Sequence, residues 1–409
     1  LVGFTKGLRN FLRRQSYNFK VLIVKRGLES FFSGFTSNYT SVYVTKLGAD
    51  PVQLGGLNSL GGIASAILAL PMGWLLDTYS LKKTYLLTLI LSILLPLTYA
   101  VSMDWRMALI PVALGYITMS SSMVVENVIL ANSLRDEDRA TGIGLIQALT
   151  GVAMSLSPTL AGLVLNMLGG LEVEYMRVLF LIQLIGSCLA FAWILFRFKE
   201  PMNVVRRSVK LNFIEDLKEV LASSRSKKWL LVELSGGFIF GMVIPFIYVY
   251  AAEVKHADAL TLGLMGSGMN FTYMASSIPI GKLADRIGRK KTIMLLRPTL
   301  YLSMILLVVA PSPEYLILAM ALRGFTWGGM AAWSSLALEL VSESERGRWS
   351  GVIQLLRNLF RVPAPLVGGY LWAALDPSAP FLILVLVDIL FRVPLIASTP
   401  ETLEARNSR

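Results

Sequence analysis

The sequence predicts an all-α membrane protein of twelve transmembrane helices, arranged as two similar halves of six helices each. The chain of 409 residues is 55% hydrophobic and only 16% charged, and its mean hydropathy is +0.62. Soluble globular proteins are far less apolar than this. The apolar stretches are long and rich in Leu, Ile, Ala and Gly, which is typical of spanning helices. Segments of the first half also recur in the second half.

The predicted spans follow from the rule that about 20 apolar residues cross a bilayer as a helix. They lie at residues 20–46, 51–77, 83–102, 106–132, 140–168, 174–197, 229–252, 259–284, 291–310, 314–341, 347–374 and 379–398. This divides the chain into a basic tail (1–19), a first six-helix half (20–197), a linker with an amphipathic helix (198–228), a second half (229–398) and a second tail (399–409). No large soluble domain fits between the spans.

The positive charges are distributed unevenly along the chain. The net charge is +12, which in a soluble protein would suggest a nucleic-acid partner. Of the 38 lysines and arginines, only Lys46, Arg106, Arg177 and Lys255 fall on the predicted outer side. Cytosolic loops are enriched in positive residues, so we expect both termini and the linker in the cytosol and no nucleic-acid partner.

Several functions are excluded by composition. One cysteine, Cys188, and one histidine, His256, cannot supply a disulfide framework, a thiolate or histidine metal cluster, or a Ser-His-Asp triad. The sequence also lacks the Gly-x-x-x-x-Gly-Lys-Ser/Thr loop that binds ATP phosphates. We therefore expect no enzyme activity, no metal and no cofactor.

An internal repeat supports the division into two halves. Gly73 and Asp77, after the second span, recur as Gly281 and Asp285 after the eighth span, an offset of 208 residues. After the fourth span, five residues recur with an offset of 207: Arg139, Gly144, Gln147, Pro158 and Gly162 correspond to Arg346, Gly351, Gln354, Pro365 and Gly369. An even number of spans separates the copies, so the two halves have the same orientation in the membrane.

The stretch Gly281-Lys-Leu-Ala-Asp285-Arg-Ile-Gly288-Arg289-Lys-Lys resembles the loop signature of the major facilitator superfamily. Its first copy keeps the glycine, the aspartate and the basic tail but departs from the pattern at residues 78, 80 and 81. The resemblance covers nearly the whole chain and implies a cytosolic gate in which Asp77 faces span eleven and Asp285 faces span five. The implied gate residues are Gly73, Asp77, Gly281, Asp285, Arg286 and Arg289.

The physical reading of this loop is independent of the resemblance. A glycine lets two helices approach closely, and a carboxylate stabilises the positive end of a neighbouring helix by about 0.3 to 1 kcal/mol. The alternative is a tight turn that only orients the chain.

Pro158 with Gly162, and Pro365 with Gly369, resemble the Pro-x-x-Gly-Gly element of exporters in this superfamily. They predict kinked, closely packed helices that seal the two halves at the outer side.

Carboxylates inside the predicted spans are candidates for proton transfer, because a charge at bilayer depth is costly and needs a cavity or a partner. Glu29 in the first span and Glu126 in the fourth lie at similar depth, and we expect both to carry protons. The alternative for Glu29 is an ion pair with Lys25 or Arg26 on its own helix, and for Glu126 a structural pair.

The second half is instead rich in arginine. Arg323, Arg357 and Arg361 are expected to bind an anionic substrate or to pair with Glu29 or Glu126 in one conformation. A competing interpretation pairs Arg361 with Asp388, while the spacing of Asp388 and Arg392 favours a structural pair, and Glu233 suits a gate or interface. The remaining residues expected to line the substrate space are Ser33, Tyr116, Phe240, Asn270, Tyr273 and Trp327.

Together these features predict a secondary active transporter that works by alternating access. We expect proton-coupled export of small amphiphilic compounds by a monomer in a cell membrane, with a prokaryotic plasma membrane favoured. One alternative is proton-coupled uptake or exchange of a small organic anion. A second alternative is a non-transporting membrane sensor on the same fold, which a measurement of substrate flux distinguishes.

Overall fold

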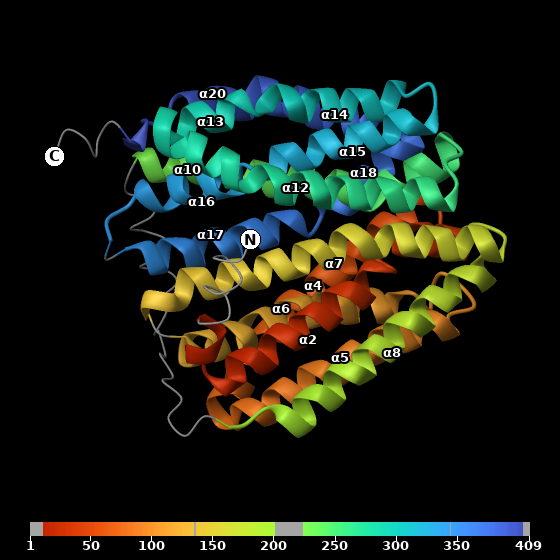
Figure 1. Ribbon diagram of the computed structural model, residues 1–409. Helices are drawn as coiled ribbons and strands as arrows, with labels where there is room; N and C mark the ends of the chain where they lie inside the picture. Colours follow the sequence, from red (N-terminus) through yellow and green to blue (C-terminus); the bar gives the residue numbers. More distant parts are fainter. Residues whose placement is uncertain (1–10, 135, 201–223, 344, 404–409) are drawn as a thin grey trace, which may run out of the picture.

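The computed structural model describes residues 11–134, 136–200, 224–343 and 345–403. Within these ranges every regular element is a helix, and there is no strand. Figure 1 shows two groups of long helices running side by side, one formed by the first half of the sequence (red to yellow) and one by the second (green to blue). The amphipathic helix predicted in the linker lies outside the described residues.

The first group starts at the end of the N-terminal tail. Its elements are α2 (Tyr17–Gly34), α3 (Thr40–Lys46), α4 (Pro51–Thr78), α5 (Leu81–Val101), α6 (Leu109–Ser133), the short 3-10 helix η1 (Asp136–Asp138), α7 (Arg139–Leu168) and α8 (Val173–Arg197). Local sequence explains several of the starts. The Ser16 hydroxyl accepts from the amide of Phe19, and Asp50 and Gln53 exchange side-chain bonds with each other's amides in a capping box before α4.

The second group contains more interrupted helices. Its elements are α10 (Ser224–Val243), η2 (Ile244–Phe246), α11 (Ile247–Val249), η3 (Tyr250–Val254), α12 (Ala259–Ile287), α13 (Arg289–Leu295), α14 (Arg297–Val309), α15 (Pro313–Trp327), α16 (Met330–Glu339), α17 (Arg346–Arg361), α18 (Ala364–Ala374), α19 (Ala379–Val387), η4 (Asp388–Arg392) and α20 (Val393–Ala397). The breaks fall at helix-disrupting residues. Pro245 lies in η2, Gly328 and Gly329 separate α15 from α16, and Pro363 separates α17 from α18.

Seven helical segments in the described ranges are long and apolar enough to cross a membrane. They are Leu81–Val101, Leu109–Ser133, Thr141–Leu168, Val173–Arg197, Lys227–Val254, Arg289–Val309 and Ala379–Ala397. Twelve such stretches were predicted from the sequence. Part of the difference arises because the predicted tenth and eleventh spans are each divided into two shorter helices, and because α2 carries Lys20, Lys25, Arg26 and Glu29.

The two ends of the bundle differ in how the groups contact each other. We call the end with the connections at 47–50, 102–108, 169–172, 255–258, 310–312 and 375–378 the seam end, on the right in Figure 1, and the opposite end the tail end. One large buried apolar cluster contains residues of both groups, including Tyr43 and Phe180 of the first and Phe246 and Phe381 of the second. Separate clusters lie nearer the tail end of each group, around Tyr85 in the first and Trp349 in the second.

Candidate functional site

A cluster of buried charges lies inside the first group, and we call Lys25, Arg26, Glu29, Tyr85 and Glu126 the first charge cluster. Lys25 Nζ is 2.7 Å from Glu29 Oε2 and 2.6 Å from Glu126 Oε1. Arg26 Nε forms an ion pair with Glu126 Oε2, and the Tyr85 hydroxyl donates to Glu126 Oε1 at 2.9 Å. The side chains of Lys25 and Glu126 are fully buried, whereas 30% of Glu29 is exposed. Helices α2, α5 and α6 therefore place two carboxylates around one ammonium group.

The two predicted proton carriers thus have different surroundings. Glu126 faces two cations and a phenol, which compensate its charge inside the helix group. Glu29 has one cation, Lys25, and keeps access to solvent. The pair between Glu29 and Lys25, one of the alternatives raised by the sequence, is present. Lys25 was not predicted as the residue that joins the two carboxylates, although its position four residues before Glu29 was the available signal.

A second charge cluster lies inside the second group and joins α10, α14, α16, α17 and η4. Arg297 Nη1 is 3.0 Å and Arg392 Nη1 is 2.6 Å from Asp388 Oδ1, and the Tyr301 hydroxyl donates to the other carboxylate oxygen at 2.7 Å. The structural pair predicted between Asp388 and Arg392 is therefore confirmed, and Asp388 is paired with Arg297 instead of Arg361. The other part of the cluster is Glu233, which accepts from Trp333 Nε1 at 2.7 Å and from Arg357 Nη1 at 3.2 Å.

The second cluster occupies positions that the repeat relates to the first. Glu233 lies 208 residues after Lys25, and Trp333 lies 207 residues after Glu126. The carboxylate of Glu233 therefore lies at the position equivalent to the ammonium group of Lys25. The indole of Trp333 lies at the position equivalent to the carboxylate of Glu126. The two halves keep a polar contact at equivalent positions, but an ion pair in the first half corresponds to a hydrogen bond from a neutral indole in the second.

At the seam end the two groups touch backbone to backbone. A Cβ added to Gly263 of α12 would lie 2.3 Å from the carbonyl oxygen of Pro158 in α7, and one added to Gly55 of α4 would lie 2.3 Å from that of Pro365 in α18. Likewise, a Cβ at Gly369 would lie 2.2 Å from the carbonyl oxygen of Pro51. Only glycine allows such contacts, so the close packing predicted for the proline and glycine elements is confirmed.

Side chains add hydrogen bonds to the seam between α7 and α12. The hydroxyl of Tyr39, which is fully buried, donates to the carbonyl oxygen of Ala259 at 2.9 Å. Asn270 Nδ2 donates to the carbonyl oxygen of Met154 at 3.0 Å. That carbonyl lacks its usual helical partner because Pro158, four residues later, has no amide hydrogen. The proline therefore leaves an acceptor in α7 that a side chain of α12 uses.

A carboxylate also joins α7 and α12 at the seam end. Asp258 caps α12 by accepting from the amide of Thr261 at 2.8 Å, and it accepts from Asn166 Nδ2 of α7 at 2.9 Å. Partial burial acts to raise the pKa of Asp258, but the hydrogen bonds from Thr261 and Asn166 outweigh it and lower that pKa. The carboxylate that joins the two groups is therefore ionised at neutral pH.

The predicted gate of the second half lies at the tail end, and we call Asp285, Arg289, Glu339 and Glu401 the gate cluster. Arg289 Nη2 is 3.1 Å from Asp285 Oδ1, and Arg289 Nε is 3.4 Å from Glu339 Oε1. Glu401 accepts from the amides of Arg289 at 2.9 Å and Lys291 at 3.1 Å, so it caps the start of α13. These contacts join α12, α13, α16 and the segment after α20 within the second group.

The contact expected between Asp285 and the fifth span is absent in this structure. The Asp285 side chain is 70% exposed, and its ion pair is made with Arg289 on the next helix. No described atom outside the adjoining turns of α12 lies within 4 Å of a Cβ built on Gly281, so the close approach expected there is also absent. Arg286 is exposed. The side chains of the first copy, Gly73 and Asp77, lie outside the described residues.

Two acidic helix caps were not found by sequence reasoning. Glu200, after α8, accepts from the amides of Leu81 at 2.8 Å and Lys82 at 2.9 Å at the start of α5. Glu401 makes the equivalent contact in the second group. The only signal in the sequence is an acidic residue beside a proline, shortly after the last apolar stretch of each half. Each carboxylate stabilises the positive end of a helix next to a gate loop.

The backbone conformation of Gly288 leads to a prediction about the stability of the gate cluster. Its φ is +109°, and a Cβ there would lie 2.4 Å from the Glu401 carboxyl carbon. We expect Gly288→Ala to lower the free energy of unfolding by about 1 to 3 kcal/mol, because alanine is strained at this φ and displaces the cap. A thermal melt of the purified protein measures this. Gly281→Ala is the matched control, with little change expected, and equal melting temperatures for both variants would contradict the assignment.

The other residues predicted to line a substrate space are dispersed. The Tyr116 hydroxyl donates to Asn58 Oδ1 at 3.3 Å, and Ser33 is half-buried and donates within its own helix. Phe240 packs against Arg392 of the second charge cluster. Two of the remaining residues are held by contacts described above: Asn270 lies in the seam, and Arg357 is paired with Glu233. The others differ in exposure, with Tyr273 and Trp327 each 38% exposed, Arg361 half-buried and Arg323 buried.

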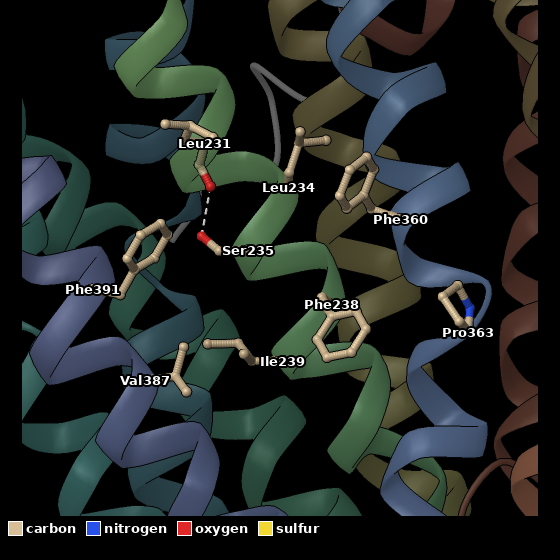
Figure 2. Close-up of a pocket in the computed structure, with 9 residues that line it drawn as sticks. All are labelled: Leu231, Leu234, Ser235, Phe238, Ile239, Phe360, Pro363, Val387 and Phe391. Carbon is tan, nitrogen blue, oxygen red and sulfur yellow. Dashed lines mark hydrogen bonds between the residues drawn. The ribbon is translucent and has the colours of Figure 1, made fainter.

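An apolar groove of about 500 Å³, which none of these residues lines, lies between α10, the α17–α18 break and the end of α19 with η4 (Figure 2). It is lined by Leu231, Leu234, Ser235, Phe238, Ile239, Phe360, Pro363, Val387 and Phe391. Ser235 donates to the carbonyl oxygen of Leu231 on its own helix, as the dashed line in Figure 2 shows. Ser235 is thus the one polar residue in this lining, and its hydroxyl hydrogen is already donated to its own helix.

Comparison with known families gives a match over almost the whole chain. The model described as Major Facilitator Superfamily matches residues 28–260 and 229–408, two overlapping ranges that cover most of the first half and all of the second. Among solved structures, the chain is similar to a mutant form of the nucleoside transporter NupG. The TM-score is 0.76 at 16% sequence identity, with 93% of this chain and 99% of the other covered.

Two curated proteins illustrate the relationship at the level of sequence. The tetracycline resistance protein, class B, of Escherichia coli is 27% identical over 188 residues, so the match spans 46% of this chain and only 47% of that protein. A multi-drug resistance efflux pump PmrA homolog of Lactococcus lactis is 25% identical over 382 residues, 87% of this chain and 89% of the relative.

Proposed function

Because the chain belongs to the major facilitator superfamily, and is therefore a membrane transporter and not an enzyme, we propose that it works by alternating access between two six-helix bundles. The bundles are residues 20–197 and 229–398, with twelve spans in total, joined by a linker at 198–228. We place the tail end and both termini in the cytosol, since positive residues are scarce in the connections of the seam end. We further propose a monomer in a prokaryotic plasma membrane.

The arrangement described above fits an inward-facing state. The seam end is closed by backbone contacts such as that between Gly263 and Pro158 and by the shared apolar core. At the tail end Asp285 is exposed and does not reach α7. In the opposite state, Asp285 and Asp77 are proposed to contact the fifth and eleventh spans, while the seam separates.

We propose that protons drive transport through the first charge cluster. Glu29 exchanges the proton, because its carboxylate is partly exposed in the state that faces the cytosol. When Glu29 binds a proton at a carboxylate oxygen, Lys25 loses one of its two counter-charges and pairs with Glu126 alone. The cluster then gains one positive charge, which is costly away from water and changes the relative energies of the two conformations. The observation that carries this proposal is the shared ammonium group of Lys25.

The direction proposed is export of small amphiphilic compounds in exchange for protons. The similarity to a tetracycline resistance protein and to a multi-drug efflux pump homolog supports this direction. Uptake or exchange of an organic anion is the second candidate, favoured by the Arg357 side chain, which is 41% exposed. Inside-out proteoliposomes that accumulate a probe when their lumen is acidic would indicate proton antiport, whereas accumulation driven by an acidic exterior would indicate symport.

The coupling proposal predicts the behaviour of two variants. In proteoliposomes with an imposed pH gradient, Glu29→Gln is expected to reduce gradient-driven transport of tetracycline to the level of empty vesicles. Exchange of the same probe without a gradient is expected to persist, because the binding site is unchanged. Glu174→Gln, at an exposed carboxylate of the seam end, is the control with full activity. If Glu29→Gln combined with Glu126→Gln left gradient-driven transport intact, the proton-carrier assignment would be wrong.

A further inference from the structure

Arg323, about one turn before the end of α15, is a buried cation without a counter-ion among the described residues. Its side chain is 2% exposed. The contact made by its guanidinium group is from Nη1 to the thioether sulfur of Met304 in α14, at 4.0 Å. Tyr248 of α11 lies within electrostatic range, but its phenol is neutral at physiological pH. A thioether and a phenol do not compensate a full positive charge.

The other buried cations in the described ranges all have a carboxylate partner. Lys25 pairs with Glu29 and Glu126, Arg289 with Asp285 and Glu339, and Arg297 and Arg392 with Asp388. These pairs also account for Glu29 and Glu126, which the sequence offered as possible partners for Arg323. Because guanidinium stays protonated even when buried, Arg323 carries an uncompensated charge in a membrane helix.

An uncompensated buried charge destabilises the folded protein, so its presence calls for an anion that is not part of the described chain. Backbone crowding holds the residue in place, because a Cβ added to the neighbouring Gly324 would lie 2.1 Å from the carbonyl oxygen of Met269 in α12. Two helix breaks lie close by, at Gly328 and Gly329 in this helix and at Pro245 before α11. Movement at these breaks is a route by which the guanidinium becomes accessible.

We propose that Arg323 binds the acidic group of the transported compound, so that the substrate class is small amphiphilic organic acids. This inference rests on the proposed transport function and specifies its substrate. The guanidinium offers a planar, bidentate donor set for a carboxylate or a comparable oxyanion. The apolar part of the substrate is then left to the side chains beside the guanidinium, which include Met304 and Tyr248. An amphiphilic cation without an acidic group would be repelled at this position.

The first test is the sign of a stability change, measured without any ligand. Arg323→Met is expected to raise the melting temperature of the detergent-purified protein by about 1 to 3 °C, because it removes an unpaired buried charge at similar volume. The matched control is Arg297→Met, which leaves Asp388 with one cation fewer and is expected to lower the melting temperature. A decrease for Arg323→Met as large as that for Arg297→Met would assign Arg323 a structural role and overturn the proposal.

The second test uses three probes in the same melting assay: salicylate, tetracycline with its acidic enol, and the cation ethidium. Salicylate or tetracycline is expected to raise the melting temperature of the unmodified protein, and ethidium is not. The shift is expected to disappear in Arg323→Met and to be partly kept in Arg323→Lys, which retains the charge. If neither acid shifts the melting temperature, or if the shift persists in Arg323→Met, the proposal is refuted.

Flux measurements distinguish a failure of the proposed substrate class from a failure of the proposed transport function. Gradient-driven transport of ethidium with no effect of either acid would leave the transporter assignment in place and overturn the substrate class. Absence of flux for all three probes, together with an acid-dependent stability shift that requires Arg323, would support the anion site and count against transport.

Discussion

Lys25→Met is expected to produce the largest loss of stability of any single substitution considered for this protein. The substitution leaves the buried carboxylate of Glu126 with Arg26 alone and removes the ion-pair partner of Glu29. Breaking a buried ion pair by removing one partner typically costs about 3 to 5 kcal/mol. We expect a lower melting temperature, little folded protein after purification, and no transport. Thermal melts in detergent and fluorescence-detected size-exclusion chromatography measure the first two effects, and flux in proteoliposomes measures the third.

A double variant distinguishes loss of the charge pair from loss of packing. In Lys25→Met with Glu126→Gln, both charges are gone, so we expect the melting temperature to recover substantially toward that of the unmodified protein. Lys20→Met, one turn earlier on α2 and only half-buried, is the matched control and is expected to change stability little. If the effects of Lys25→Met and Glu126→Gln simply added, the two residues would not be energetically coupled, and the first charge cluster would not act as a unit.

The sequence was sufficient to predict the features that depend on spacing along one helix or on the repeat. Pro158 and Pro365 of the seam illustrate this, although the two glycines that their carbonyl groups contact were not among the predicted residues. Pro158 and Pro365 are 207 residues apart, and their carbonyl groups contact Gly263 and Gly55, which are 208 residues apart. Close packing there could be predicted because glycine and proline restrict what a helix can do wherever it lies.

Features that depend on contacts between distant helices could not be predicted in the same way. The sequence placed Glu29 and Glu126 at similar depths, but the sequence separation of 101 between Lys25 and Glu126 hid the ion pair that joins them. Arg323 was assigned to a substrate space from its position in a span, without any signal that it is buried or that Asp388 is already paired with other arginines. Spacing within one helix reports only neighbours three or four residues away.

The gate cluster shows a different limit, because a sequence pattern does not specify a conformation. The loop signature at Gly281 to Arg289 implied a contact between Asp285 and the fifth span, and this structure instead has Asp285 exposed. A transporter that alternates between two states makes that contact in one of them only. The same chain therefore satisfies the pattern whether the gate is open or closed.

Gly369→Val is expected to shift the equilibrium between the two states by preventing closure of the seam. A Cβ at this position would lie 2.2 Å from the carbonyl oxygen of Pro51, and a backbone atom cannot move aside as a flexible side chain can. Overpacking of this kind costs about 1 to 3 kcal/mol, a factor of about 5 to 150 in a two-state equilibrium. Because the clash exists only when α4 and α18 are in contact, the state with the seam open is favoured and gradient-driven transport falls.

Spin labels on opposite sides of the seam measure this shift directly. Met103 and Leu375 are exposed at the seam end, one in each group, and Cys188→Ser removes the only native cysteine. In this background, electron-electron double resonance is expected to report longer distances between labels at 103 and 375 in Gly369→Val. Gly144→Val is the matched control, because no described atom outside the adjoining turns of α7 lies within 4 Å of a Cβ at that glycine. A clash that favours the open state must separate the labels. If Gly369→Val kept the original label distances and full flux, the backbone contact at this glycine would therefore not control the seam.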